Sequence, residues 1–157
     1  MASPAGIVRQ YLINQNLVIL PGIPNETISP EQVPGDGTTF CYVPSMPDEP
    51  DQAVSIQNMV GMKFGRNQRT GKTWLHAGVK ILVRALDHHT GYNLANSICV
   101  AIDDFTRGVV VIDDVEHYVQ SLYREPLIEL GEETLKKRQL FSINARVAMQ
   151  DVEPSLG

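Results

Sequence analysis

The stretch of sequence that decides the fold is residues 74–105, WLHAGVKILVRALDHHTGYNLANSICVAIDDF. In its first half, apolar residues occupy every second position and would share one face of a strand: Val79, Ile81, Val83 and Ala85. This period of two is typical of a long β-strand, here residues 74–86, with one buried face. The chain then turns, and Thr90 is the predicted N-cap of a helix that runs to about Phe105. Apolar residues recur there at helical spacing and make a wide face: Leu94, Ala95, Ile98, Cys99, Ala101, Ile102 and Phe105.

The chain before this stretch predicts a short helix and a long loop. Residues 1–16 contain the helix, because Ser3 suits the N-cap and Pro4 suits the first helical position. Residues 17–51 are predicted to be an extended loop with one short strand at 38–43, since seven of the ten prolines fall within this part of the chain.

Residues 52–150 are predicted to hold the sheet and the long helix. Besides 74–86, the predicted strands are 52–60, 109–112, 115–124 and 140–149. Asp113 and Asp114 suit the tight turn of a hairpin. The segments 61–73 and 125–139 predict polar loops, and residues 151–157 predict a flexible tail. The last strand would turn five side chains inward: Phe141, Ile143, Ala145, Val147 and Met149.

The order of these elements predicts an α+β fold. A chain of 157 residues fits one domain. We therefore expect a single domain over residues 1–157, with a mainly antiparallel sheet, two helices packed on one face and a long N-terminal proline-rich loop.

The composition of the chain argues against several classes of protein. The formal net charge is −5, from 13 Lys and Arg against 18 Asp and Glu, which argues against a dedicated nucleic-acid binder. Hydrophobic residues make up 43% of the chain, which excludes wholesale disorder. No apolar run approaches the ~20 residues of a membrane span, and no signal for secretion is expected. Cys41 and Cys99 lie among apolar residues, so buried free thiols are favoured over a disulfide.

No set of residues predicts catalysis, a cofactor or a metal site. Residues 71–73 read GKT, but a phosphate-binding loop needs a glycine where Arg66 stands and a helix where a strand is predicted. His88 and His89 are adjacent, and neighbours in sequence rarely converge on one ion. We expect them to decorate the turn before the helix. The chain is therefore not expected to be an enzyme.

Charges of opposite sign separate into two neighbouring segments. The acidic segment contains Asp48, Glu49 and Asp51. The basic segment contains Lys63, Arg66, Arg69 and Lys72. These seven residues are the predicted contact residues, either within one subunit, between subunits or toward a partner. Contact with protein is favoured over nucleic acid, although Phe64 and Trp74 beside the basic residues could stack on bases.

Several motifs, in this order and spacing, resemble the tail terminator proteins of long-tailed bacteriophages, also called tail completion or minor capsid proteins. Arg84, Ala95 and Ile98 match the family's strand and helix. Pro126 and residues 130–133 (LGEE) match its proline and acidic turn. The final strand, RQLFSINARV from Arg138 to Val147, and the segment YVPSMPDEPDQAVSI before the sheet also match. The resemblance covers residues 40–150, and the proline-rich 21–37 insertion and the basic segment have no counterpart in it.

The resemblance implies a non-enzymatic virion protein. Members of the family form a ring, usually hexameric, that caps the head-proximal end of the tail tube and ends its growth. The implied partners are further copies of the chain, the tail tube protein and a head-completion or neck protein, with genomic DNA passing through the ring without specific binding and no membrane contact. The implied location is the tail–neck junction of the virion, after assembly in the host cytoplasm.

Two alternatives stay open at this point. One is another neck or head-completion protein of the same particle. The other is a small ligand-binding or enzymatic domain, which would contain a deep polar pocket with perturbed titratable groups.

Overall fold

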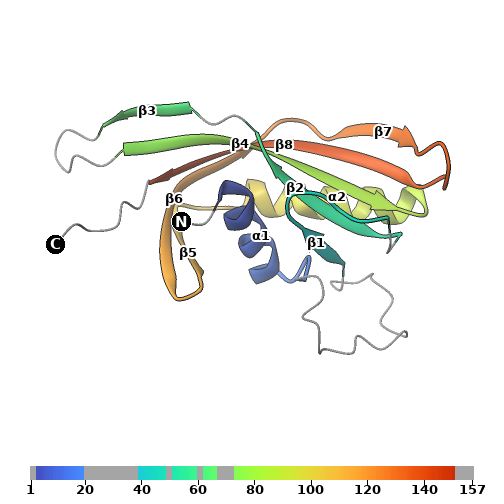
Figure 1. The fold of residues 1–157 in the computed structure, drawn as a ribbon, viewed down its shortest axis with the longest axis horizontal. Helices are drawn as coiled ribbons and strands as arrows, with labels where there is room; N and C mark the ends of the chain where they lie inside the picture. Colours follow the sequence, from blue (N-terminus) through green and yellow to red (C-terminus); the bar gives the residue numbers. More distant parts are fainter. Residues whose placement is uncertain (1–2, 20–38, 49–50, 60–61, 67–72, 151–157) are drawn as a thin grey trace.

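A computed structural model describes residues 3–19, 39–48, 51–59, 62–66 and 73–150 of the chain (Figure 1). The elements follow in the order α1 (Pro4–Asn14), β1 (Phe40–Tyr42), β2 (Ala53–Asn58), β3 (Met62–Arg66), β4 (Thr73–Ala85), α2 (His88–Asp103), β5 (Gly108–Ile112), β6 (Val115–Arg124), β7 (Ile128–Glu132) and β8 (Gln139–Gln150). The predicted loop at 17–51 falls largely outside the described residues, as do residues 67–72 and the predicted tail.

The sheet is built around the long antiparallel pair of β4 and β8, which runs from Trp74 opposite Gln150 to Ala85 opposite Gln139. The strands β3 and β2 follow one another along the outer edge of β4, and β6 and β7 share the outer edge of β8. β1 adds to β2 in parallel, and β5 adds to β6 as an antiparallel hairpin. The described residues thus form a mostly antiparallel sheet of eight strands with two helices, as the predicted α+β fold requires.

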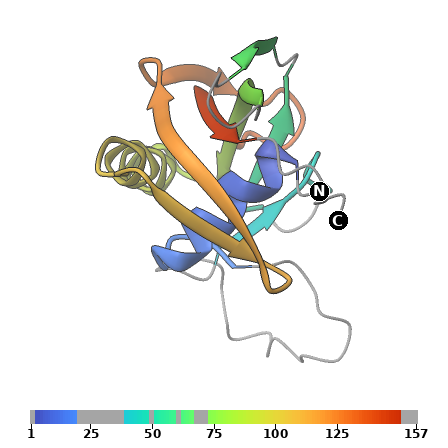
Figure 2. The same cartoon turned by 90° about the vertical axis from the view of Figure 1, so that its left-hand side faces the viewer.

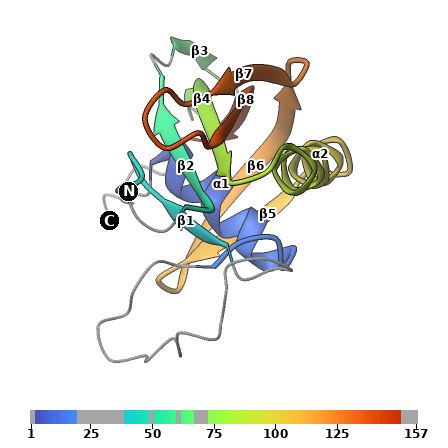
Figure 3. The same ribbon diagram turned by 90° about the vertical axis from the view of Figure 1, so that its right-hand side faces the viewer.

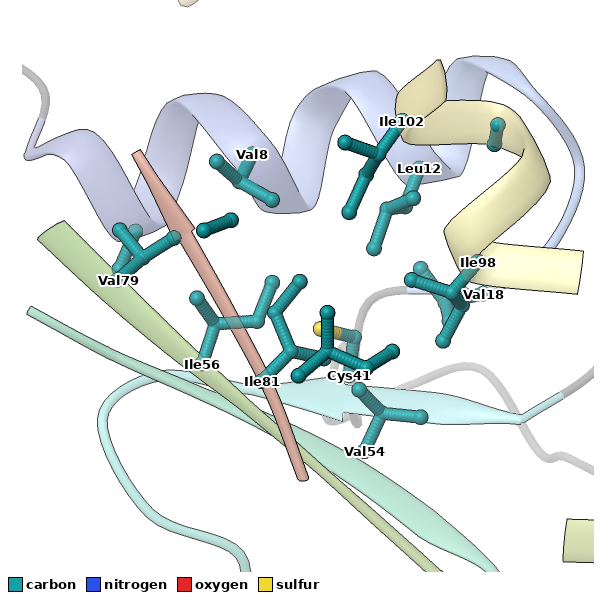
Figure 4. Close-up of a cluster of buried hydrophobic side chains, with 14 of the residues drawn as sticks. Val8, Leu12, Val18, Cys41, Val54, Ile56, Val79, Ile81, Ile98 and Ile102 are labelled. Carbon is teal, nitrogen blue, oxygen red and sulfur yellow. The ribbon is translucent and has the colours of Figure 1, made fainter. Parts of the chain in front are cut away.

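Both helices pack on one face of this sheet, as predicted (Figure 3). Val8 and Leu12 of α1 and Ile98 and Ile102 of α2 meet the same group of strand side chains (Figure 4). The predicted inward faces of β4 and β8 are buried: Val79, Ile81, Val83, Ala85, Phe141, Ile143, Ala145, Val147 and Met149. The alternation in the sequence therefore identified the core correctly.

The two cysteines belong to this core. Cys41 and Cys99 are both buried and both free thiols, as predicted. Burial raises the pKa of Cys41 to about 12. A thiol with so high a pKa is protonated at neutral pH and is a poor nucleophile.

Two strands were predicted to be loops. Met62–Arg66 pairs with the start of β4, and Ile128–Glu132 pairs with the start of β8. All five residues of β7 are exposed, and its pairing shifts by one residue between Glu129 and Gly131, where Gly131 has a φ of +88°. β7 has no buried face, and its apolar alternation is limited to Ile128 and Leu130 because the bulge follows at once, so the pattern is too short to predict a strand.

The predicted N-cap of the long helix was also wrong. Asp87, not Thr90, caps α2, and its carboxylate accepts hydrogen bonds from the backbone N–H groups of His89 and Thr90. Aspartate and threonine both favour this position, and the shorter turn after β4 selects Asp87. The helix ends at Asp103, two residues before the predicted end. The hairpin turn was predicted correctly, and Asp113 and Asp114 both have positive φ, as a tight two-residue turn requires.

Gly91 allows the start of α2 to lie directly on the sheet. A Cβ atom at this position would lie 2.5 Å from Cε2 of the buried Phe141 ring and 3.2 Å from Cβ of Ala85. We expect Gly91→Ala to lower the free energy of unfolding by about 1–2 kcal/mol, because the overpacking cost outweighs alanine's better helix propensity. Chemical denaturation measures this loss. Gly108→Ala is the control, since its Cβ would meet only the Thr106 carbonyl oxygen at 3.6 Å, and equal midpoints for the two variants would contradict the close packing.

Candidate functional site

Two arginines are buried side by side at one end of the central strand pair. Arg84 lies near the end of β4, opposite Leu140, and Arg138 comes directly before β8. Arg138 is 2% exposed and Arg84 is 5% exposed. Buried guanidinium groups require hydrogen-bonding partners, and both side chains find them in the segment just before β2.

Arg138 binds the acidic segment directly. Its Nη1 donates to the backbone oxygen of Asp48 at 2.6 Å, and its Nη2 donates to Asp48 Oδ1 at 3.0 Å and to Glu133 Oε1 at 2.7 Å. Asp51 Oδ1 lies 3.4 Å from Nη1. The guanidinium group thus joins residues separated by about ninety positions in sequence.

Arg84 and Lys136 complete the contact. Arg84 donates to the backbone oxygens of Asp51 and Pro47 at 3.1 Å and 2.8 Å. Lys136 Nζ donates to Asp48 Oδ2 at 2.6 Å. We call these six residues the arginine cluster: Asp48, Asp51, Arg84, Glu133, Lys136 and Arg138. It attaches the acidic segment to the end of the sheet.

The electrostatics of the cluster favour the charged forms of Asp48 and Arg138. Hydrogen bonds from Lys136 and then Arg138 hold the pKa of Asp48 below its ordinary value of 3.8. The hydrogen bond to Glu133 raises the pKa of Arg138, whereas burial lowers the pKa of Arg84, with the charge of Arg138 acting in the same direction. These shifts keep Asp48 and Arg138 charged, which suits positioning of a surface rather than proton transfer.

The structure separates the predicted contact residues into two groups. Asp48 and Asp51 lie in the arginine cluster, and the backbone of Lys63 and Arg66 lies in β3 at the other end of β4 (Figure 1). A strand rises about 3.3 Å per residue, so the two ends of the 13-residue β4 lie about 40 Å apart. Glu49, Arg69 and Lys72 lie outside the described residues. Residues 63–66 therefore do not meet the acidic segment within one subunit, and a contact between subunits stays a prediction.

The sequence pattern did not predict three members of the arginine cluster: Glu133, Lys136 and Arg138. They lie in a segment predicted to be a polar turn, and Arg138 entered only through the resemblance to the family. The run KKR at 136–138, directly before an alternating strand, was the one available signal. The sequence alone does not show that Arg138, the third residue of this run, is buried while Lys136 and Lys137 are exposed.

The structure also places the residues that were weighed for other chemistry. His88 and His89 were predicted to lie in the turn before the helix, but they are the first two residues of α2. Residues after GKT form strand β4, with no helix at which a phosphate-binding loop could end. His88 lies on the surface, with Nε2 3.1 Å from Glu129 Oε1 and its ring stacked on Tyr92. Within the described ranges, no three His, Cys, Asp or Glu side chains gather as metal ligands would. Neither α1 nor α2 has the length and hydropathy of a membrane-crossing helix.

Comparison with known proteins gives two findings. A family model described as bacteriophage tail terminator protein matches residues 11–149. Among solved structures, the chain is similar to one from a structure titled "Virion of native gene transfer agent (GTA) particle", with a TM-score of 0.51 and 11% sequence identity. That similarity covers 96% of this chain and 100% of the other, and at such identity it shows a shared fold. The curated proteins gave no match.

Proposed function

Because the chain belongs to the bacteriophage tail terminator family and is a structural protein of the phage virion, we propose that it forms a ring that caps the head-proximal end of the tail tube. The match of the family model over residues 11–149 carries this proposal, since it includes the end of α1, the whole of α2 and the whole sheet except the last residue of β8. The ring would be a homo-hexamer that ends tube polymerisation.

The proposed partners follow from that position. One face of the ring meets the last layer of the tail tube protein, and the opposite face offers a docking surface to a head-completion or neck protein. Genomic DNA passes through the opening without specific binding. Assembly takes place in the host cytoplasm, and the protein performs no catalysis. A surface positioned by ion pairs, as in the arginine cluster, suits such a scaffolding role.

A phage that lacks this protein tests the proposed function. We expect its lysate to contain heads separate from tails, and the tails to be abnormally long, because nothing caps the growing tube. Electron microscopy measures tail length and attachment. Tails of normal length joined to heads would contradict the function, and tails of normal length without heads would favour the alternative of a neck protein.

The basic segment is proposed to contact the neighbouring subunit or partner. Exposed ion pairs contribute only about 0.2–1 kcal/mol each and weaken with salt, so their role is to set register while apolar contacts hold the ring. We expect Arg66→Glu with Arg69→Glu to lower the ring population at low salt, as measured by native mass spectrometry. Unchanged assembly at low and high salt would place the basic segment on another surface.

The compensating change must avoid the arginine cluster. Asp48→Lys with Asp51→Lys, the reversal that the sequence suggests, would also remove the partners of the buried Arg138. A failed rescue by that pair would then report damage to the fold. Glu49→Lys is the better choice, because it reverses a charge of the acidic segment and leaves Asp48 and Asp51 in place.

A further inference from the structure

A cavity lies between α1 and the tip of the β5–β6 hairpin. Figure 2 shows this hairpin running past α1 and projecting beyond it. The cavity has a volume of about 440 Å³. Its lining includes the apolar residues Val43, Ile112 and Val115 and the polar residues Arg9, Gln10 and His117. A hollow with a mixed apolar and polar lining suits an apolar side chain flanked by polar groups.

His117 is a buried polar side chain beside the cavity. Its side chain is 2% exposed, and its Nδ1 has no hydrogen-bonding partner among the described residues. Nearly all buried polar atoms in native proteins are paired. Burial lowers the pKa of His117, so its imidazole is neutral at pH 7 and can accept or donate one further hydrogen bond.

The turn between β7 and β8 presents an apolar side chain of suitable size. Leu135 is 93% exposed, the highest value among the large hydrophobic residues of the described ranges. The turn is nevertheless held firmly. Glu133 N donates to Arg138 O at 2.7 Å and Lys137 N donates to Glu133 O at 3.0 Å, while Lys136 is bonded to Asp48. Because the turn is already ordered, inserting Leu135 into a partner costs little conformational entropy.

The two features lie toward opposite ends of the subunit. Along the longest axis in Figure 1, the β7–β8 turn lies at one end and the β5–β6 hairpin lies toward the other. A projection and a hollow on different sides of one molecule cannot satisfy each other within it. They can do so between copies arranged head to tail, which is the contact that a closed ring requires.

We propose that Leu135 of one copy inserts into the cavity between α1 and the β5–β6 hairpin of the next copy. This inference rests on the proposed ring and identifies its apolar contact. Leu135 packs against Val43, Ile112 and Val115 of the neighbour.

The flanking charges fit the same orientation. The turn carries exposed Glu132 on one side of Leu135 and exposed Lys137 on the other. The cavity is lined by Arg9 on α1 and Asp113 at the hairpin tip. Glu132 opposite Arg9 and Lys137 opposite Asp113 give two attractive pairs, and the reversed orientation gives two repulsive ones. Such pairs fix which way the turn enters.

A pair of cysteines tests the contact in the full chain. In the variant Leu135→Cys with Val115→Cys, each copy carries one thiol on the turn and one in the cavity. The native Cys41 and Cys99 are buried and do not compete. We expect oxidation to give a covalent ladder that extends beyond the dimer on a non-reducing gel. Either single variant should stop at the dimer, because each copy then carries only one accessible thiol.

A control pair distinguishes the proposed contact from random collision. Leu135→Cys with Val100→Cys places the second thiol on the exposed face of α2, away from the cavity. An equal ladder from this pair, or no ladder from the first, would overturn the inference. As a second measurement, Leu135→Asp should weaken self-association by about tenfold or more, whereas Val100→Asp should not.

The outcomes also separate this inference from the proposed function. If the cysteine pair gives no ladder, but phage lacking the protein make overlong tails, the ring is held by other surfaces and only the inference fails. If such phage make tails of normal length, the proposed function fails, whatever the cross-links show. If Val115→Asp abolishes binding to the tail tube protein but leaves self-association unchanged, the cavity serves that partner and the inference is overturned.

Discussion

Replacing Ile102 with alanine is expected to lower the free energy of unfolding by about 2–5 kcal/mol. The side chain is fully buried on the inner face of α2, where it meets the side chains of α1 and the sheet (Figure 4). Removing three carbon atoms there leaves a cavity that the close-packed helices and strands cannot fill without moving. Chemical denaturation followed by circular dichroism measures the loss.

Val100→Ala is the matched control for this prediction. Val100 lies on the opposite face of the same helix and is about half exposed. Its truncation should change stability by less than about 0.5 kcal/mol, as is usual for surface substitutions. An Ile102→Ala variant that unfolds at the midpoint of the control would show that α2 does not pack on the sheet as described.

The second large effect is expected from Arg138→Ala, which should cost about 2–4 kcal/mol. The substitution removes a buried side chain together with its hydrogen bonds to Asp48 and Glu133. The loss falls below that of a fully buried pair, because the Asp48 side chain is 69% exposed and water can hydrate it once Arg138 is gone. The free energy of unfolding measures this loss.

Two further variants test the cause. Arg124→Ala removes a bidentate pair with Asp103 that lies on the surface, and should cost no more than about 1 kcal/mol. Arg138→Lys keeps the charge but cannot bridge the same set of oxygens, so it should recover only part of the loss. Equal losses for Arg138→Ala and Arg124→Ala would show that burial of the arginine cluster contributes nothing.

The arginine cluster links stability to the proposed assembly. It attaches the acidic segment to the same end of the sheet that carries the β7–β8 turn, because Lys136 and Glu133 belong to that turn. A mutation in the cluster should therefore disturb both the fold and the position of Leu135. Assembly experiments on the cluster need a measurement of folding beside them.

Most of the fold can be predicted from the sequence, because the spacing of apolar residues indicates which strands and helices have one buried face. Val79, Ile81 and Val83 alternate because one face of β4 is covered, and Ile98 and Ile102 recur at helical spacing because one face of α2 is covered. The same holds for the last strand and for the Asp113–Asp114 turn, whose positive φ values suit these two residues. Periodicity reports burial on one side of an element, and these elements have that property.

The elements that the sequence did not predict lack a clear apolar periodicity. β7 is exposed along its length and exists because the edge of β8 beyond β6 offers unpaired backbone groups. The charges behave similarly. The sequence showed that an acidic and a basic segment follow one another. Only the tertiary structure shows that the described part of the basic segment lies at the far end of β4 and that Asp48 forms an ion pair with Arg138. Pairing partners ninety residues apart depend on which strand ends meet, and this is decided by the packing of the whole sheet.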